Sequence, residues 1–347
     1  MMALHKHKMT HKELRDQGGL EHSTLNDRGR RFGKSFFSRP FSMMRKILLL
    51  FLFVFIAAPA QAAQFTDASG RVVTFEKPFT RIISLYSAHT ENLLAMGARD
   101  SLIGASKSEL AKDLPRFSYH DGTERFLAAR PDLVLIRPMI ERGYQRLVKS
   151  LEARGITVVS LQPSSVPEML SYWKTLGLLS GQEANAEKLV TEFEVETELI
   201  ESLTSGVTPK RSVFFEAMHG KLRTFSKNSM AIWALELAGG VNVASDAVPS
   251  KGSNIAIYGK EKLLSKGPRI EVYLAQQGRM NRVTRDEIKK EPGFKLIKAV
   301  RDGEIHFVDE ALVSRPTPAL LKGVKMIGRI LYPEIFAATT EGWVVNE

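Results

Sequence analysis

The sequence predicts an α/β protein made of two α/β sandwich lobes, each with a central sheet, joined by a single long linking α-helix. Three observations support this prediction. A charged, unbroken helical pattern occupies the middle of the chain, and the stretches on either side of it repeat one another. The chain has 347 residues and 44% apolar residues, which is enough to bury two cores. Two similar lobes on one rigid helix leave a cleft between them, and such a cleft is suited to holding a ligand.

The helical pattern runs from residue 182 to about residue 205 and contains neither Pro nor Gly. Gly181 before it, and Gly206 and Pro209 after it, are typical of helix ends. Its length predicts about six turns, or roughly 35 Å, and a stiff helix of this kind allows only modest closure of the lobes. Apolar positions among many Glu residues support this helix, and they are Ala184, Leu189, Phe193, Leu199 and Leu203.

Matching segments before and after this helix form an internal repeat. In both halves a Glu precedes a Pro by seven residues, a short helix is predicted between them, and an apolar strand follows the Pro. Upstream of each pair, a helix that ends in glycine is followed by another strand. The pairs are Glu124 with Pro131 and Glu261 with Pro268, and the strands after them cover residues 133–136 and 270–274.

Residues 43–62 have the composition of a secretory signal peptide. Arg45 and Lys46 form a basic start, residues 47–56 form an apolar core, and residues 60–62 read Ala-Gln-Ala, a small-residue cleavage site. A membrane anchor is the alternative, but the apolar run is shorter than the roughly 20 residues that span a bilayer. We therefore expect export to the periplasm with cleavage of the leader.

Most of the positive charge lies in this leader. The whole chain carries a formal charge of +11, whereas residues 63–347 carry +4, so we expect no nucleic-acid partner. The chain has no Cys, hence no disulfide and no cysteine for lipid attachment, and we expect a soluble protein. The predicted segments are a basic extension that is disordered or a mis-assigned start (1–42), the signal peptide (43–62), the N-terminal α/β lobe (63–180), the linking helix (181–206) and the C-terminal α/β lobe (207–347).

Candidate ligand contacts follow predicted strands, because open α/β sheets bind ligands at the carboxyl ends of their strands. Each candidate has a structural alternative, such as packing at a helix start or lying on an ordinary surface. The candidates in the first lobe are Tyr86, His89, Tyr119, His120, Arg137 and Met139. Those in the second lobe are Met218, His219, Arg223, Phe225, Gln277, Arg282 and Arg315.

Four of these candidates are arginines, whose permanently charged guanidinium groups bind carboxylates and phosphates. We expect two of the four to reach the ligand and the others to be solvated or paired within their lobes. The methionines and aromatic residues suit a bulky, partly apolar chelate better than a bare ion.

Several motifs occur in a characteristic order along residues 65–336. They are Arg81-Ile-Ile-Ser-Leu85 with Thr90-Glu91, then Gly97, Ile103-Gly104, Arg130-Pro-Asp-Leu-Val-Leu135, Leu237-Ala-Gly-Gly-Val-Asn-Val-Ala244 and Ser314-Arg-Pro316. Together they resemble the class III periplasmic binding proteins of ABC importers, the group that includes the ferric-siderophore, haem and vitamin B12 binding proteins. The resemblance implies a bilobed fold, no enzymatic activity, and a partner made of the permease and ATPase of an importer in the inner membrane.

The resemblance also gives Glu124 and Glu261 a role. In the vitamin B12-binding member of the family, a glutamate at the start of the matching helix in each lobe docks onto arginines of the permease. The alternative is that each carboxylate only complements a helix N-terminus, which stabilises a helix by about 0.3–1 kcal/mol. That alternative accounts less well for the equal spacing in both halves, so we expect permease docking.

Other chemistries find little support in the residues. The Gly-x-Ser-x-Gly pattern of hydrolases and the Gly-x4-Gly-Lys-Ser/Thr phosphate loop are missing from the sequence. His89, His120, His219 and His306 are scattered and share no i, i+4 pair, so we expect no catalytic residues, no protein-bound metal ion and no cofactor.

The sequence therefore predicts a monomeric periplasmic substrate-binding protein of an ABC importer. The expected ligand is a small-molecule metal chelate of the iron-siderophore type, held in the cleft, because the arginines favour an anionic iron chelate. Cobalamin (vitamin B12 or another corrinoid) is the first alternative ligand and haem the second. A periplasmic ligand sensor is the alternative of a different functional class.

Overall fold

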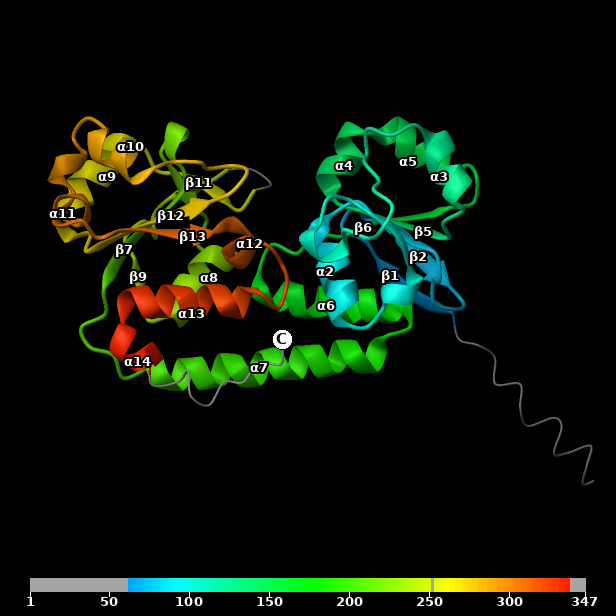
Figure 1. Ribbon diagram of the computed structural model, residues 1–347, viewed down its shortest axis with the longest axis horizontal. Coiled ribbons are helices and arrows are strands. Elements are labelled where there is room, and N and C mark those ends of the chain that lie inside the picture. Colours follow the sequence, from blue (N-terminus) through cyan, green and yellow to red (C-terminus); the bar gives the residue numbers. More distant parts are fainter. Residues whose placement is uncertain (1–61, 251–252, 338–347) are drawn as a thin grey trace, which may run out of the picture. The chain divides into compact units, whose positions relative to one another are not determined.

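In the computed structural model, residues 62–250 and 253–337 are described (Figure 1). The predicted basic extension and all but the last residue of the predicted signal peptide lie outside these residues. The described chain falls within one compact unit, residues 60–347. We refer to the elements before helix α7 as the first lobe and to those after it as the second lobe; the exact lobe boundaries stay a prediction.

A hairpin opens the described chain. Strand β1 (Ala63–Thr66) pairs antiparallel with β2 (Val72–Phe75). The Asp67 carboxylate closes the turn, because its Oδ1 accepts the backbone N–H groups of Ser69 and Arg71.

The first lobe contains a four-stranded parallel sheet in the order β4-β3-β5-β6. Alternate residues of its strands enter two different cores: Ile82 and Leu133 pack with α2 and α6, whereas Ile83 and Val134 pack with α3, α4 and α5. Figure 1 shows these helices on opposite faces of the sheet. The strands are β3 (Ile82–Ser84), β4 (Leu102–Ala105), β5 (Leu133–Ile136) and β6 (Thr157–Ser160), and the helices are α2 (Ser87–Ala95), α3 (Thr123–Ala129), α4 (Pro138–Gly143), α5 (Gln145–Glu152) and α6 (Val166–Ser180).

The second lobe repeats this topology. Its parallel strands follow the order β9-β7-β12-β13, and an antiparallel extension, β8-β11-β10, continues from β7. In both lobes the second parallel strand of the chain lies on one side of the first, and the third and fourth lie on the other. The strands are β7 (Ser212–Met218), β8 (Arg223–Phe225), β9 (Val241–Asn242), β10 (Val248–Pro249), β11 (Ile255–Ile257), β12 (Val272–Gln277) and β13 (Ile305–Asp309).

Helices cover both faces of the second sheet too. Phe214 and Tyr273 lie in a core with residues of α9, α10 and α11, whereas Phe215 and Leu274 lie in the core that contains α8 and α13. The helices are α8 (Met230–Leu237), α9 (Lys260–Lys266), α10 (Arg285–Lys290), α11 (Lys298–Asp302), α12 (Glu310–Val313), α13 (Leu320–Leu331) and α14 (Pro333–Ala337).

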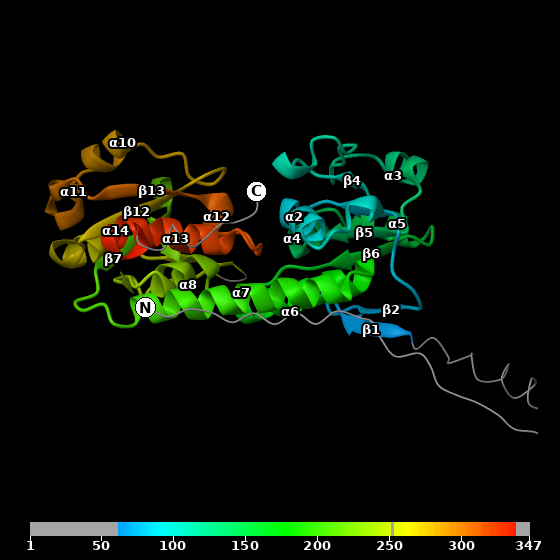
Figure 2. The ribbon, with the colours of Figure 1, turned by 60° about the horizontal axis from the view of Figure 1, so that its bottom comes forward.

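Helix α7 (Glu183–Thr204) matches the predicted central helix. Its 22 residues correspond to about 33 Å. It packs on α6, as Figures 1 and 2 both show, and on α8 and α13 of the second lobe. Phe193 lies between the two lobes' tryptophans, with its ring edge-on to Trp173 of α6 at 5.2 Å and stacked on Trp233 of α8 at 5.7 Å.

Of the apolar residues that predict this helix, Phe193 is buried and Leu189 packs against the core, whereas Leu199 is 45% exposed and Ala184 is exposed. The buried residues of α7 follow one another at intervals of three, four or seven positions, which places them on one face of the helix. That face includes a polar position, because Thr204 is buried and its hydroxyl donates to the carbonyls of Ile200 and Leu237. The buried residues are Ala186, Val190, Phe193, Ile200 and Thr204.

Candidate ligand-binding site

In both sheets the chain first adds a strand on one side of the first parallel strand and later adds the next ones on the other side. From β3 the chain passes to β4 on one side and later to β5 on the other, and from β7 it passes to β9 and later to β12. The loops that leave the carboxyl ends of such a pair diverge, and open α/β sheets bind ligands at this switch point. We call the segments after β3 and β5 (residues 85–87 and 137–139) the first edge, and those after β7 and β12 (residues 219–222 and 278–282) the second edge.

The first edge brings Tyr86 and Arg137 together. Each residue is the N-cap of a helix, α2 and α4 respectively, and the Arg137 guanidinium lies over the Tyr86 ring, 4.8 Å from its centroid. An Nη2 of Arg137 also lies 3.6 Å from the Sδ of Met139, which is 40% exposed. Among the described residues Arg137 has no carboxylate partner. Its half-buried charge is therefore available to an anionic group.

Burial raises the pKa of the Tyr86 hydroxyl, and the positive charges of Arg137 and Arg315 act in the opposite direction. Arg315 of the second lobe therefore lies near enough to influence the first edge. The structure thus places Tyr86, Arg137 and Arg315 in one electrostatic neighbourhood.

Tyr119 and His120 form an aromatic cluster with Tyr144, a residue that the sequence reasoning did not select. The ring centroids lie 4.5 Å apart for Tyr119 and His120 and 4.7 Å apart for Tyr119 and Tyr144. The Tyr144 hydroxyl lies 3.1 Å from Nδ1 of His120, and His120 is exposed. An aromatic residue directly after the last residue of a short helix, Gly143, was the available signal.

The expectation that His89 contacts ligand is wrong. Its side chain has no exposed surface, and both ring nitrogens are occupied: Nε2 donates to the Ile136 carbonyl at 3.0 Å, and Nδ1 accepts from the Tyr172 hydroxyl at 2.6 Å. Burial lowers the pKa of His89 to about 4, so the ring is neutral at pH 7. His89 is a structural residue of the core.

The second edge is organised around Glu216, a fully buried carboxylate of β7 that the sequence reasoning also missed. Its Oε2 accepts from Nδ1 of His219 at 2.8 Å and from the Tyr273 hydroxyl, and its Oε1 accepts from Nδ2 of Asn281 at 3.0 Å. Oδ1 of Asn281 in turn accepts the backbone N–H of His219. A glutamate within the apolar strand, three residues before a histidine, was the signal in the sequence.

The remaining candidates of the second lobe differ in burial and in their hydrogen-bond partners. Phe225 is 2% exposed and packs edge-on against Phe215, which corrects the expectation that it contacts ligand. Arg223 donates to the Ser250 hydroxyl, and Gln277 donates to the Val283 carbonyl within its own loop. Met218 is partly buried, and Arg282 is exposed with no carboxylate partner among the described residues.

Arg315 is paired within the protein. Its Nη1 donates to Oε1 of Glu91 on α2 at 2.7 Å, and burial raises the pKa of Glu91 while Arg315 opposes that shift. The next residue, Pro316, has a carbonyl that accepts from Nδ2 of Asn92 and Nε1 of Trp173. The segment before α13 is therefore tied to α2 and α6, and the Arg315 charge is already partly neutralised.

Glu124 and Glu261 occupy equivalent places in the two lobes. Each is the second residue of a seven-residue helix, α3 or α9, and each is exposed and without an ion pair among the described residues. The cations beside them are paired elsewhere. These pairs are Arg125 with Asp121 at 3.3 Å, Lys260 with Glu291 at 2.7 Å and Lys262 with Asp246 at 2.9 Å.

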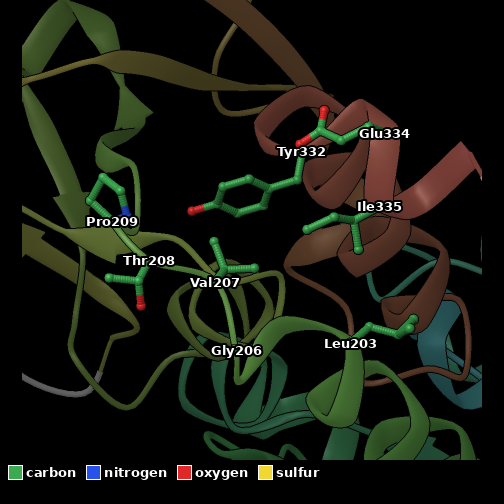
Figure 3. Close-up of a pocket in the computed structure, with 8 residues that line it drawn as sticks. All are labelled: Leu203, Gly206, Val207, Thr208, Pro209, Tyr332, Glu334 and Ile335. Carbon is green, nitrogen blue, oxygen red and sulfur yellow. The ribbon is translucent and has the colours of Figure 1, made fainter.

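A surface pocket of about 550 Å³ lies elsewhere, where the chain leaves α7 for β7 (Figure 3). Its one charged lining residue is Glu334, which disfavours an anionic ligand, and none of the candidate residues lines it. We therefore do not assign the ligand to this pocket. The lining residues are Leu203, Gly206, Val207, Thr208, Pro209, Tyr332, Glu334 and Ile335.

Two absences among the described residues concern other classes of site. These residues contain no group of three or more His, Asp or Glu side chains placed to hold a metal ion. They also contain no helix with the length and apolar character needed to cross a membrane.

Comparisons with known proteins agree with this architecture. A family model described as periplasmic binding protein matches residues 82–312. The chain is 24% identical over 279 residues to the uncharacterized ABC transporter substrate-binding lipoprotein YvrC of Bacillus subtilis, covering 78% of this chain and 85% of that protein. It is 22% identical over 268 residues to a cobalamin-binding protein of Halobacterium salinarum, covering 74% and 70%.

A solved structure gives the same result. The crystal structure of a possible iron-binding (periplasmic solute-binding) protein from Staphylococcus epidermidis superposes with a TM-score of 0.64 and 26% identity, covering 74% of this chain and all of that one. The family model covers well over half of the chain. The chain therefore belongs to the class III periplasmic binding proteins, the non-enzymatic substrate-binding proteins of ABC importers.

Proposed function

We propose that this substrate-binding protein captures an anionic metal chelate of the ferric-siderophore type between its first and second edges. The observation that carries the proposal is the Arg137 guanidinium, which lies on the Tyr86 ring and has no carboxylate partner among the described residues. A charged fork beside an aromatic ring fits a ligand with anionic oxygens on a partly apolar body. Exposed Met139 and Arg282 extend the same combination of apolar and positive groups.

The relatives support the choice of ligand class to different degrees. The Staphylococcus epidermidis protein, described as possible iron-binding, shares 26% of its residues with this chain. The Halobacterium salinarum relative, named as a cobalamin-binding protein, shares 22%. Cobalamin is therefore the second candidate ligand, and we rank an anionic chelate above it because the Arg137 guanidinium has no carboxylate partner among the described residues.

Delivery to the permease is proposed to use Glu124 and Glu261. Both carboxylates are exposed, and the neighbouring cations are engaged in pairs within the lobes, so both can accept arginines from a partner. Their equivalent places on α3 and α9 fit a partner with two similar contact sites. The proposed partner is the permease and ATPase complex of an importer.

Export is the remaining part of the proposal. The family acts outside the cytoplasm, and we propose the periplasm as the compartment, reached by cleavage of residues 43–62, with the mature protein acting as a monomer. Mass determination of protein isolated from the periplasm tests both points. A mass that corresponds to a chain beginning at Ala63 is the expected result.

The ligand is tested by tryptophan fluorescence of the chain from Ala63 onward. Trp233 is half-buried on α8, and Trp173 is buried on α6, where its Nε1 donates to the carbonyl of Pro316, the residue after Arg315. Ferric catecholate and ferric hydroxamate chelates, haem and cyanocobalamin are titrated in turn, with correction for their absorbance. We expect saturable quenching at micromolar or lower concentration by one iron chelate, and tight binding of cyanocobalamin alone would replace that proposal with the second candidate.

A further inference from the structure

The ring of His219 is held in one orientation by groups that are themselves buried. Glu216 has no exposed surface, and its carboxylate takes hydrogen bonds from His219, Tyr273 and Asn281. Asn281 also accepts the backbone N–H of His219 at 3.0 Å. A further contact comes from Phe294, which meets the His219 ring edge-on with centroids 6.1 Å apart. Neither the ring nor its backbone is free to turn without breaking one of these bonds.

This arrangement decides which ring nitrogen is available. A carboxylate accepts but does not donate, so Nδ1 of His219 carries the hydrogen in the bond to Glu216. Nε2 has no hydrogen-bond partner among the described residues, and it is not one of their buried unpartnered atoms. The side chain is 15% exposed. Nε2 is therefore the atom that the second edge presents to its surroundings.

We propose that His219, as a positively charged imidazolium, donates from Nε2 to an anionic oxygen of the bound ligand, and that Glu216 acts as its positioning residue. The inference rests on the proposed function, because it assumes an anionic ligand at the second edge. It gives the second lobe a positively charged ligand contact of its own, in addition to Arg137 of the first edge. It also makes ligand affinity depend on pH.

The groups that face His219 favour its charged form. Glu216 comes from β7, and Glu287 and Glu291 come from α10 and its C-terminal cap. Tyr273 of β12 donates to the same Glu216 carboxylate, and Lys260 is paired through its Nζ with Oε1 of Glu291 at 2.7 Å. The hydrogen bond to Glu216 raises the pKa of His219 above its ordinary value of 6.5, and partial burial opposes this shift.

The sign of the pH dependence follows from this. The imidazolium is fully present at pH values below its pKa in the folded protein and is lost as the pH rises through that value. Affinity for an anionic chelate should then fall by up to about tenfold per pH unit above the His219 pKa. A neutral ligand such as cyanocobalamin gives no such slope.

The experiment has two arms on the chain from Ala63 onward. In the first, the His219 ring is followed by NMR across pH 5–9 in the free protein and in E216Q. In the second, the dissociation constant of a ferric tris-catecholate chelate is measured across pH 6–9 for the wild type, H219Q, E216Q and H306Q. His306 is the matched control, since its Nε2 also lies near a carboxylate, Glu304, at 3.3 Å, but it is in β13 and outside both edges.

The expected results are a His219 pKa above 6.5 that falls in E216Q, a pH-dependent affinity in the wild type and H306Q, and a flat profile in H219Q. If E216Q does not fold, H219Q alone decides, because it removes only a partly buried ring. If the dissociation constant depends on pH in the same way in the wild type and in H219Q, the role of His219 is overturned while the proposed function stays intact. Failure of the wild type to bind any chelate at any pH overturns both.

Discussion

His89 and His219 stand at comparable places in the two lobes and do opposite things. Each follows the first parallel strand of its sheet, β3 or β7. His89 is buried, bonded at both nitrogens and held neutral, with its pKa lowered to about 4. His219 is bonded at one nitrogen to a buried carboxylate, which raises its pKa. The same topology thus supports two edges with different electrostatics.

The two lobes share a topology but differ in which charged groups lie at their edges. The first edge places its histidine in the core and leaves an arginine, Arg137, without a carboxylate partner. The second edge buries a carboxylate, Glu216, and uses it to hold a histidine toward the surface. Under the proposal made above, an always-charged group supplies positive charge on one edge and a titrating group supplies it on the other.

The largest expected effect concerns a feature in which the lobes agree, the exposed glutamates of α3 and α9. We expect the double variant E124R/E261R to reduce chelate uptake by cells to the level of a strain that lacks the protein, because like charges would then face the permease arginines. Ligand affinity measured by fluorescence should stay unchanged. E198R, on the exposed face of α7, is the control and should transport normally. A parallel loss of affinity in the double variant would contradict the docking role.

The second prediction concerns the buried Glu216 carboxylate that organises the second edge. We expect E216A to lower the free energy of unfolding by about 3–5 kcal/mol, because the buried Tyr273 hydroxyl loses its acceptor and the Asn281 amide loses one of its two. Urea denaturation followed by circular dichroism measures this. The control E304A removes a half-exposed carboxylate that pairs with Arg211 and His306, and it should cost less than about 1 kcal/mol. Equal losses in the two variants would show that Glu216 is not the centre of the network.

Much of the fold could be predicted because it depends on local patterns. The apolar run at residues 133–136 coincides with β5, and the unbroken helical pattern coincides with α7. The buried face of α7 does not follow from its apolar residues alone, because Thr204 is also buried and its hydroxyl bonds to two carbonyls.

The site was predicted less well, because its chemistry depends on pairs that are distant in the sequence. The candidates were chosen because they follow predicted strands, but a sequence does not show that Arg315 is paired with Glu91 or that His89 is hydrogen-bonded to Tyr172. Phe225 looked like a loop residue and is instead in strand β8, where pairing with β7 and β11 buries its ring. Only the tertiary contacts separate partnered side chains from free ones.

The third prediction uses the opposite titration of the two histidines. His89 has a folded pKa of about 4 against an ordinary value of 6.5, so its contribution to stability is complete above pH 6.5 and is lost as the pH falls toward 4. The loss amounts to about 3 kcal/mol at most. Urea denaturation at several pH values should show that the free energy of unfolding falls between pH 6.5 and 4 in the wild type and in H219Q. The fall should be smaller in H89N. An unchanged slope in H89N would mean that His89 is not held neutral in the core.

The smallest effect is expected at Arg137, because this residue is only half-buried and other proposed groups also contact the ligand. We expect R137A to weaken binding of a ferric chelate by about ten- to a hundredfold, the loss of about 1.5–3 kcal/mol that accompanies removal of a hydrogen bond to a charged group. The free energy of unfolding should change by less than about 0.5 kcal/mol, because Arg137 has no ion pair to lose. Its matched control is R223A, since Arg223 donates to Ser250 instead of presenting a free guanidinium. A loss in R223A that equals that in R137A would remove the distinction between the free and the partnered arginines, and with it the argument that the first edge supplies the permanent charge for the ligand.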